Sequence, residues 1–177
     1  FTALEELAEY VDFTAIQAPD AGVSIYLGGQ SLLVIGNRQY PISTDVLNDK
    51  ARILDSDGIE ITSDLNSGKL IGLLDVYNNK IPSYLSDLNS LAGSVADTIN
   101  ATLSQGVDQN GNAPLQDLFA YDSTLGSAFT ITVNDVSPEQ LALSAPGQAG
   151  GNSNAITITR LANELAINNQ TFSQFYG

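Results

Sequence analysis

The chain has 177 residues, six Lys and Arg against twenty Asp and Glu, a net charge of −14, and no Cys or His. This charge repels phosphate backbones and anionic membrane surfaces, so neither nucleic acid nor a membrane is expected as a partner. Without histidine and cysteine there is no Ser-His triad, imidazole base, thiol nucleophile, disulfide or His-ligated zinc site.

The first third of the chain predicts one helix followed by antiparallel strands. Residues 1–10 place Leu4, Leu7 and Ala8 on one helical face. From Val11 the apolar period changes to two, which predicts a β meander. Its strands are 11–15, 23–27 and 32–35, with turns at Pro19–Gly22 and Gly28-Gly29. A further hairpin is predicted to pair Ile53-Leu54 with Ile59–Thr62 through the turn Asp55–Gly58.

The centre of the chain predicts a long amphipathic helix over about residues 80–105, after a short apolar helix around Leu70–Leu74. Pro82 suits a first helical turn, and Gly106 suits the position after the end. The stripe of apolar residues comprises Leu74, Ile81, Tyr84, Leu85, Leu88, Leu91, Ala92, Val95 and Ile99. It can pack within its own domain, which is the more usual case, or against a separate subunit, and both can hold at different ends.

The last third predicts a strand, a turn and another helix. Phe129, Ile131 and Val133 alternate with polar residues, which predicts the strand, and Ser137–Gln140 predicts the turn. Asn152 or Ser153 can cap a helix with one apolar face. That face carries Ala155, Ile158, Leu161, Ala162 and Leu165.

Together these elements predict an α+β fold, in which antiparallel β meander and hairpins combine with a helical part built around one long amphipathic helix. We assign residues 11–65 with 126–146 to a β-rich subdomain. Residues 1–10, 67–122 and 153–177 form a discontinuous helical subdomain, and the two could pack as one unit.

Paired carboxylates are the remaining route to catalysis. The local candidates are Asp55 with Asp57 and Glu5 with Glu6. Glycosidase carboxylates face each other across a cleft, usually from different elements, whereas these pairs lie in a turn and on a solvated helix face. We therefore predict that the chain is not an enzyme and has no catalytic residues.

Residues 108–112 resemble the start of an EF-hand calcium loop, with oxygen-bearing side chains at alternate positions. The match fails at the sixth position, which is Ala113 instead of Gly, and at the twelfth, which is Phe119 instead of Glu. An Asx-rich turn after a helix explains the same residues. Asp55–Gly58 is too short for a metal loop, and Gly28-Gly29 lacks the lysine and helix start of a phosphate loop. No metal or cofactor site is predicted.

Three blocks of sequence resemble the FlgK family of flagellar hook-associated proteins. The first runs from Leu7 to Gly36. The second begins with Ser67-Gly68-Lys69-Leu70-Ile71-Gly72-Leu73-Leu74-Asp75 and continues through the long helix to Gly106-Val107-Asp108-Gln109-Asn110-Gly111 and Leu118-Phe119. The third runs from Gly151 through Leu161 to Tyr176 and resembles the segment before the family's C-terminal helices. The blocks cover nearly the whole chain in order.

The resemblance implies a non-catalytic structural subunit that joins hook to filament in the extracellular bacterial flagellum. It implies as partners copies of itself in a ring, the hook protein, the second junction protein, and an export chaperone that binds the C-terminal region. The stretch between Phe119 and Asn152 is short, and the long terminal helices of the family are missing. We therefore expect the chain to be the central piece of a secreted protein and to be monomeric when it is isolated. A secreted acidic binding or adhesion module is the alternative.

Overall fold

The computed structural model describes residues 2–17 and 22–176. The chain divides into two compact units, Phe1–Ser83 and Tyr84–Gly177. Antiparallel strands and helices are both present, which confirms the predicted α+β class. The grouping of residues 11–65 with 126–146 as one β-rich subdomain stays a prediction. Within the described ranges, none of the helices combines the length and the apolar character that a membrane crossing requires.

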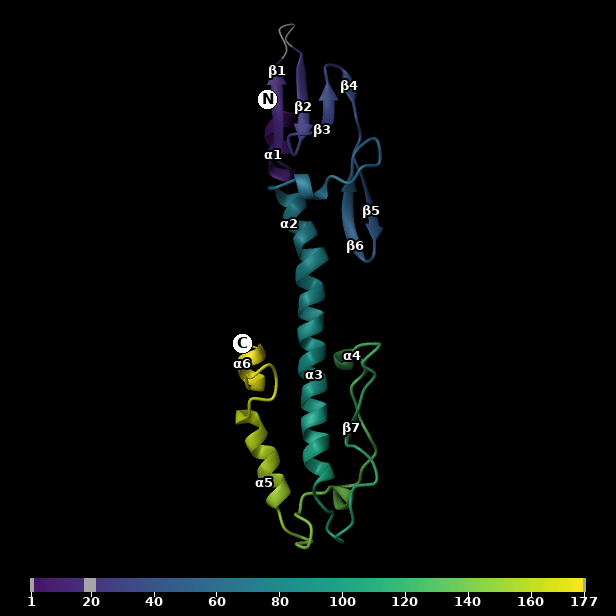
Figure 1. The fold of residues 1–177 in the computed structure, drawn as a ribbon, viewed down its shortest axis with the longest axis vertical. Coiled ribbons are helices and arrows are strands. Elements are labelled where there is room, and N and C mark those ends of the chain that lie inside the picture. The colour runs from purple at the N-terminus through teal and green to yellow at the C-terminus, as the bar shows by residue number, and fades with distance from the viewer. Residues whose placement is uncertain (1, 18–21, 177) are drawn as a thin grey trace. The chain divides into compact units, whose positions relative to one another are not determined.

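In the first unit, helix α1 (Thr2–Tyr10) leads into a four-stranded antiparallel sheet with the order β1-β2-β3-β4 (Figure 1). The strands are β1 (Phe13–Gln17), β2 (Val23–Leu27), β3 (Ser31–Ile35) and β4 (Arg38–Gln39). The predicted meander is confirmed, although β1 begins two residues later than predicted, because the Val11 N–H still bonds to the Leu7 carbonyl at 3.0 Å. Residues 19–21 of the predicted first turn lie outside the described residues.

The turn at Gly28-Gly29 joins β2 to β3 as predicted, with φ angles of 55° and 77°. A Cβ at Gly28 would lie 2.5 Å from the backbone oxygen of Asp64. Glycine is therefore required at this position by both its backbone conformation and the close approach of a second segment.

The predicted antiparallel pairing of Ile53-Leu54 with Ile59–Thr62 forms over a short stretch: Leu54 and Glu60 make a bridge, the Ile61 N–H donates to the Ile53 carbonyl and the Asp55 N–H to the Ile59 carbonyl, both at 2.9 Å. The expected second strand does not extend to Thr62, because Thr62 starts the 3-10 turn η1 (Thr62–Asp64) and its Oγ1 accepts the Ile53 N–H at 2.8 Å. The main partner of β6 (Lys50–Leu54), which was not predicted, is the preceding β5 (Ser43–Leu47), joined to it by a turn at Asn48 and Asp49 with φ angles of 52° and 61°. The predicted Asp55–Gly58 turn does form, with Gly58 at φ 78°.

The long helical segment begins earlier than predicted. α2 (Lys69–Asp75), a π-helical turn η2 (Val76–Lys80) and α3 (Ile81–Ser104) follow one another without a gap, and α3 confirms the helix predicted over 80–105. Pro82 has no N–H and its ring crowds the carbonyl four residues back in a regular helix. The widened turn before it, in which the Ile81 N–H bonds to the Val76 carbonyl, accommodates the proline.

The core of the first unit lies between the sheet, the β6 segment and the start of the long helix. Its buried side chains are Val11, Leu27, Ile53, Ile61 and Leu65. Partly buried residues of α1 and α2, including Leu7, Leu70 and Leu74, pack against this cluster. The amphipathic pattern of α1 is thus satisfied within the unit.

The second unit contains the body of α3 and a series of short elements. These are β7 (Phe119–Ala120), α4 (Ser127–Thr130), β8 (Thr132–Val133), η3 (Pro138–Gln140), α5 (Ser153–Arg160), η4 (Leu161–Asn163) and α6 (Phe172–Tyr176). β7 and β8 pair antiparallel. α5 runs beside the C-terminal part of α3, where Asn154 Nδ2 donates to the Thr102 carbonyl at 2.9 Å (Figure 1).

Two local predictions in this unit are wrong. The alternation at Phe129, Ile131 and Val133 does not make one strand, because residues 127–130 form the helical turn α4 and only Thr132–Val133 is extended. Asn89 Oδ1 of α3 accepts the Ala128 N–H at 2.9 Å and fixes that turn. The helix α5 is confirmed, but the Asn152 side chain does not cap it, and Ser153 Oγ accepts the Ala145 N–H instead.

Candidate functional site

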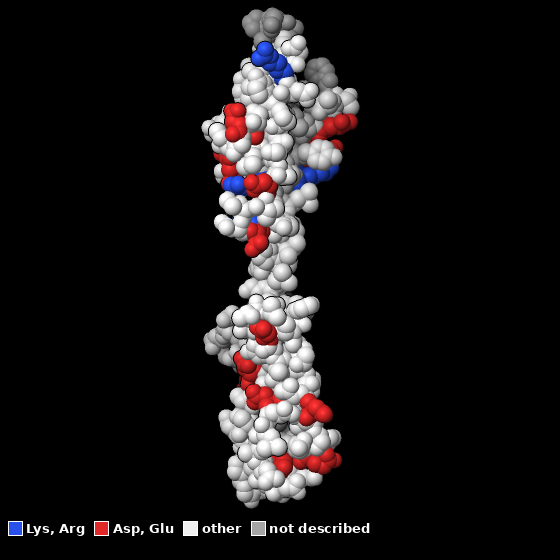
Figure 2. Space-filling view, turned by 90° about the vertical axis from the view of Figure 1, so that its right-hand side faces the viewer, with Lys and Arg blue, Asp and Glu red and all other residues white. Residues whose placement is uncertain are grey.

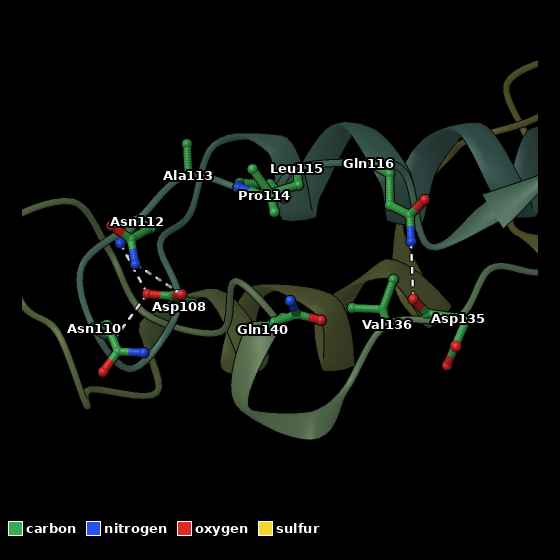
Figure 3. Close-up of a pocket in the computed structure, with 10 residues that line it drawn as sticks. All are labelled: Asp108, Asn110, Asn112, Ala113, Pro114, Leu115, Gln116, Asp135, Val136 and Gln140. Carbon is green, nitrogen blue, oxygen red and sulfur yellow. Dashed lines mark hydrogen bonds between the residues drawn. The ribbon is translucent and has the colours of Figure 1, made fainter.

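The loop after α3 is organised by the carboxylate of Asp108, whose residue is 7% exposed. Asp108 Oδ1 accepts the backbone N–H groups of Asn110 and Asn112, both at 2.8 Å, and Oδ2 accepts Asn112 Nδ2 at 3.2 Å (Figure 3). The Asp108 N–H donates to the Asn112 carbonyl at 2.8 Å. These donors, the Asn112 N–H first, lower the pKa of Asp108. The loop is the Asx turn that the sequence indicated.

An open pocket of about 610 Å³ lies beside this loop (Figure 3). Its lining includes Pro114, Leu115, Val136 and Gln140, and Gln116 Nε2 donates to the Asp135 carbonyl at 2.9 Å. Both oxygens of Asp108 are occupied by its own loop, so they present no free ligand set to this pocket. In the part of the chain that the structure describes, no group of three His, Cys, Asp or Glu residues could hold a metal ion.

The two acidic pairs considered for catalysis lie on different elements, one on α1 and the other in the turn after β6. Glu5 and Glu6 are exposed on α1. Asp55 and Asp57 line an open pocket of about 360 Å³ together with Asp64. Asp55 Oδ1 accepts the N–H groups of Asp57 and Ile59, both at 2.9 Å, so this carboxylate closes its own turn. The absence of catalytic residues stays a prediction.

The apolar stripe of α3 has two parts within the second unit. Towards its C-terminal end the stripe residues Ala92, Val95 and Ile99 are partly buried, and Ala96 and Leu103 of the same helix are buried. Near its start Tyr84, Leu85 and Leu88 are 69%, 56% and 46% exposed. An open groove of about 520 Å³ lies along this exposed part, lined by Tyr84, Asp87, Leu88, Leu91, Phe175 and Tyr176. The stripe therefore packs within its own unit at one end and is uncovered at the other.

Ion pairs among the described residues lie in the first unit. Arg52 makes a two-pronged contact with Asp45, at 2.9 Å for each bond, and reaches Glu60 at 3.4 Å. Lys69 Nζ contacts Glu9 at 2.6 Å and lies 5.2 Å from the centre of the Tyr10 ring. The hydrogen bonds and charges of these pairs lower the pKa of Asp45 and Glu9. Figure 2 shows acidic side chains scattered over the face in view with fewer basic ones.

Asparagine side chains of the long helix bind the backbone of neighbouring segments. In the second unit, Asn100 Nδ2 donates to the Phe119 carbonyl at 2.8 Å while its Oδ1 accepts the Phe119 N–H at 3.0 Å. In the first unit, Asn78 forms the same pair of bonds with Ala51, at 2.7 and 2.8 Å. These residues were not singled out from the sequence. The available signal was the placement of asparagine, a poor helix former, inside a helix.

Asn154 of α5 has a similar role. Its Nδ2 donates to the Ala142 carbonyl at 2.6 Å as well as to Thr102. A Cβ at Gly106 would collide with both the Ala142 oxygen and this Nδ2, so the contact is tightly closed. The end of α3 is thereby held to two other segments of the second unit.

Comparisons with known proteins identify relatives of this arrangement. Residues 2–119 match the family described as the flagellar hook-associated protein FlgK helical domain. A solved structure, the flagellar hook junction protein FlgK from Burkholderia pseudomallei, is similar with a TM-score of 0.55 and 28% sequence identity over 68% of this chain. The matched region spans 24% of that protein's chain. No curated protein matches the chain. Because the family match covers most of its length, the chain belongs to the FlgK family of flagellar hook-associated proteins.

Proposed function

We propose that this chain is a non-catalytic structural part of the bacterial flagellum, in the junction that joins hook to filament. The observation that carries the proposal is the family match over residues 2–119, which includes the sheet, the hairpin and the whole of the long helix. The similarity to a solved flagellar hook junction protein supports the same role. The protein that carries out this role is located outside the cell, and we infer that it is secreted through the flagellar export route.

The construction of both units fits a load-bearing part. Backbone groups of strands are bonded to the helical segment by paired asparagine bonds, from Asn78 to Ala51 of β6 and from Asn100 to Phe119 of β7. Each pair holds its strand through both a donor and an acceptor, so a displacement under load must break two hydrogen bonds together. The arrangement favours transmission of force over opening and closing around a substrate.

The proposed partners are copies of the protein in a ring, the hook protein and the second junction protein, together with an export chaperone that binds a C-terminal region of the full-length family member. The exposed apolar residues of α3, Tyr84, Leu85 and Leu88, offer surface for protein contacts. We propose no metal or cofactor. Addition of calcium should leave the melting temperature unchanged, since Asp108 uses its oxygens within its own loop.

Deletion of the gene tests the proposed role. We expect cells with hooks but without attached filaments, flagellin released into the medium and no swimming, while growth on every carbon source is unchanged. A plasmid copy of the gene should restore filaments. Normal filaments in the deletion strain would contradict the junction role and favour the adhesion module, and a growth defect on one polysaccharide would instead favour an enzyme built on the carboxylate pairs.

A further inference from the structure

Asn110 and Gly111 lie at the exposed tip of the loop that Asp108 organises. This is the single Asn-Gly pair in the sequence. Gly111 has a φ of 85°, and as a glycine it has no side chain that could shield its own backbone nitrogen. The Asn110 side chain makes no hydrogen bond within the described residues and points away from Asp108 in Figure 3. Among the described residues, no hydrogen bond therefore restrains the side-chain amide of Asn110.

We propose that Asn110 is a site of spontaneous deamidation and isomerisation. The Gly111 backbone nitrogen attacks Cγ of Asn110 and forms the new C–N bond of a five-membered succinimide ring. The nitrogen loses its proton, and the side-chain NH₂ group leaves with a proton as ammonia. Water then opens the ring at either carbonyl and leaves aspartate or isoaspartate. Each product carries one negative charge more than Asn110, and no oxidant or reductant is needed.

The loop itself controls access to this reaction. The Gly111 N–H donates to the Asp108 carbonyl at 3.1 Å, so the attacking nitrogen must first leave that bond. The flanking N–H groups of Asn110 and Asn112 are both held by Asp108 Oδ1. Loosening this network frees the nitrogen, and the rate of modification at Asn110 reports how often the loop opens.

The product changes the loop in return. Isoaspartate places an extra carbon in the backbone between positions 110 and 111. Asp108 Oδ1 can then no longer accept from residues 110 and 112 at their present spacing of 2.8 Å each. The modified turn loses its closure next to the pocket lined by Pro114 and Gln140.

Neighbouring asparagines provide internal controls. Asn112 lies in the same loop, but Ala113 follows it and its Nδ2 donates to Asp108 at 3.2 Å. Asn66 precedes Ser67, and its Nδ2 donates to the Asp64 carbonyl at 2.9 Å. A methyl or larger group on the following residue shields the nitrogen, and asparagine is among the residues that limit protein lifetime at elevated temperature. Asn110 should react before either of them.

The test is incubation of the full chain under native conditions at mildly alkaline pH, followed by peptide mass spectrometry and an isoaspartate assay. We expect mass gain and isoaspartate at Asn110 first, with Asn112 and Asn66 unmodified. Asn110→Ser should remove the signal, Gly111→Ala should slow it several-fold, and Asp108→Ala should accelerate it several-fold. The proposal is overturned if Asn110 stays intact in the folded chain while a free peptide of residues 107–113 is converted, or if another asparagine reacts first.

Discussion

The two units of the chain solve the same problem of stability in different ways. The first unit gathers large aliphatic side chains such as Leu27, Ile53 and Ile61 into one cluster and adds ion pairs at its surface. The second unit buries fewer large apolar side chains, and some of its buried residues are small, such as Ala96 and Ala142. No ion pair forms among its described residues. Its backbone groups are bonded by Asn, Ser and Thr side chains instead. An acidic chain can thus hold short segments in place through amide side chains in a unit whose one cation is Arg160.

The largest effect is expected from the apolar cluster of the first unit. Ile53 is fully buried, so Ile53→Ala should lower the free energy of unfolding by about 2 to 5 kcal/mol through lost contacts and a cavity. Val46, in the same hairpin and 60% exposed, is the matched control, and Val46→Ala should cost less than about 1 kcal/mol. Urea denaturation followed by circular dichroism measures both. Equal losses for the two variants would show that this cluster does not dominate the unit.

The second unit should be most sensitive to its amide contacts. Asn154→Ala removes the bonds to the Thr102 and Ala142 carbonyls. Thr102 keeps the Gln105 N–H as a donor at 3.3 Å, whereas the buried Ala142 loses the amide that its carbonyl accepts. We expect a loss of about 1 to 3 kcal/mol in the free energy of unfolding. Asn152→Ala is the control, because Asn152 is exposed and makes no capping bond. If the two variants are equally stable, water must replace the amide, and the proposed role of asparagine in this unit fails.

Acid should expose the role of Asp108 in the second unit. Its pKa is lowered in the folded chain, so the carboxylate contributes stability above its unfolded pKa and this contribution disappears as the pH falls through the folded value. Stability should therefore decline below about pH 4, and Asp108→Asn should flatten that decline. Melting temperatures across the acid range test this, with Asp117→Asn, an exposed site, as control. An unchanged acid profile in Asp108→Asn would contradict it.

The local sequence pattern was sufficient to predict elements whose partners lie close by in the sequence. The period-two alternation predicted the meander, the Asp-Gly pair predicted the turn at Gly58, and the apolar stripe predicted α3. It failed at the β5–β6 hairpin, because Asn48-Asp49 carries no glycine although both residues adopt positive φ. Asn and Asp tolerate that conformation, but the pair is a weaker signal than Asn-Gly.

Distant partners account for the other failures. Residues 129–133 alternate like a strand, yet Asn89, far away in the sequence, accepts the Ala128 N–H and turns that segment into α4. The Asp108 loop was predictable because the groups that donate hydrogen bonds to the Asp108 carboxylate lie within four residues of it. The bonds of Asn100 and Asn154 span 19 and 52 residues, and no spacing rule in a single sequence indicates them.

The smallest effect is expected on the uncovered part of α3, where sequence alone left two interpretations open. Leu88 is 46% exposed, so Leu88→Ala should cost less than about 1 kcal/mol in this chain, and alanine's helix propensity offsets part of that. Leu103, on the same helix and 6% exposed, is the matched control and should cost about 2 to 5 kcal/mol. Urea midpoints of the two variants measure the difference.

A loss at Leu88 as large as that at Leu103 would mean that this face is packed within the unit. If Leu88→Ala is neutral for stability but reduces filament attachment when introduced into the gene in cells, the face serves contacts in the assembled flagellum, as the proposed function requires.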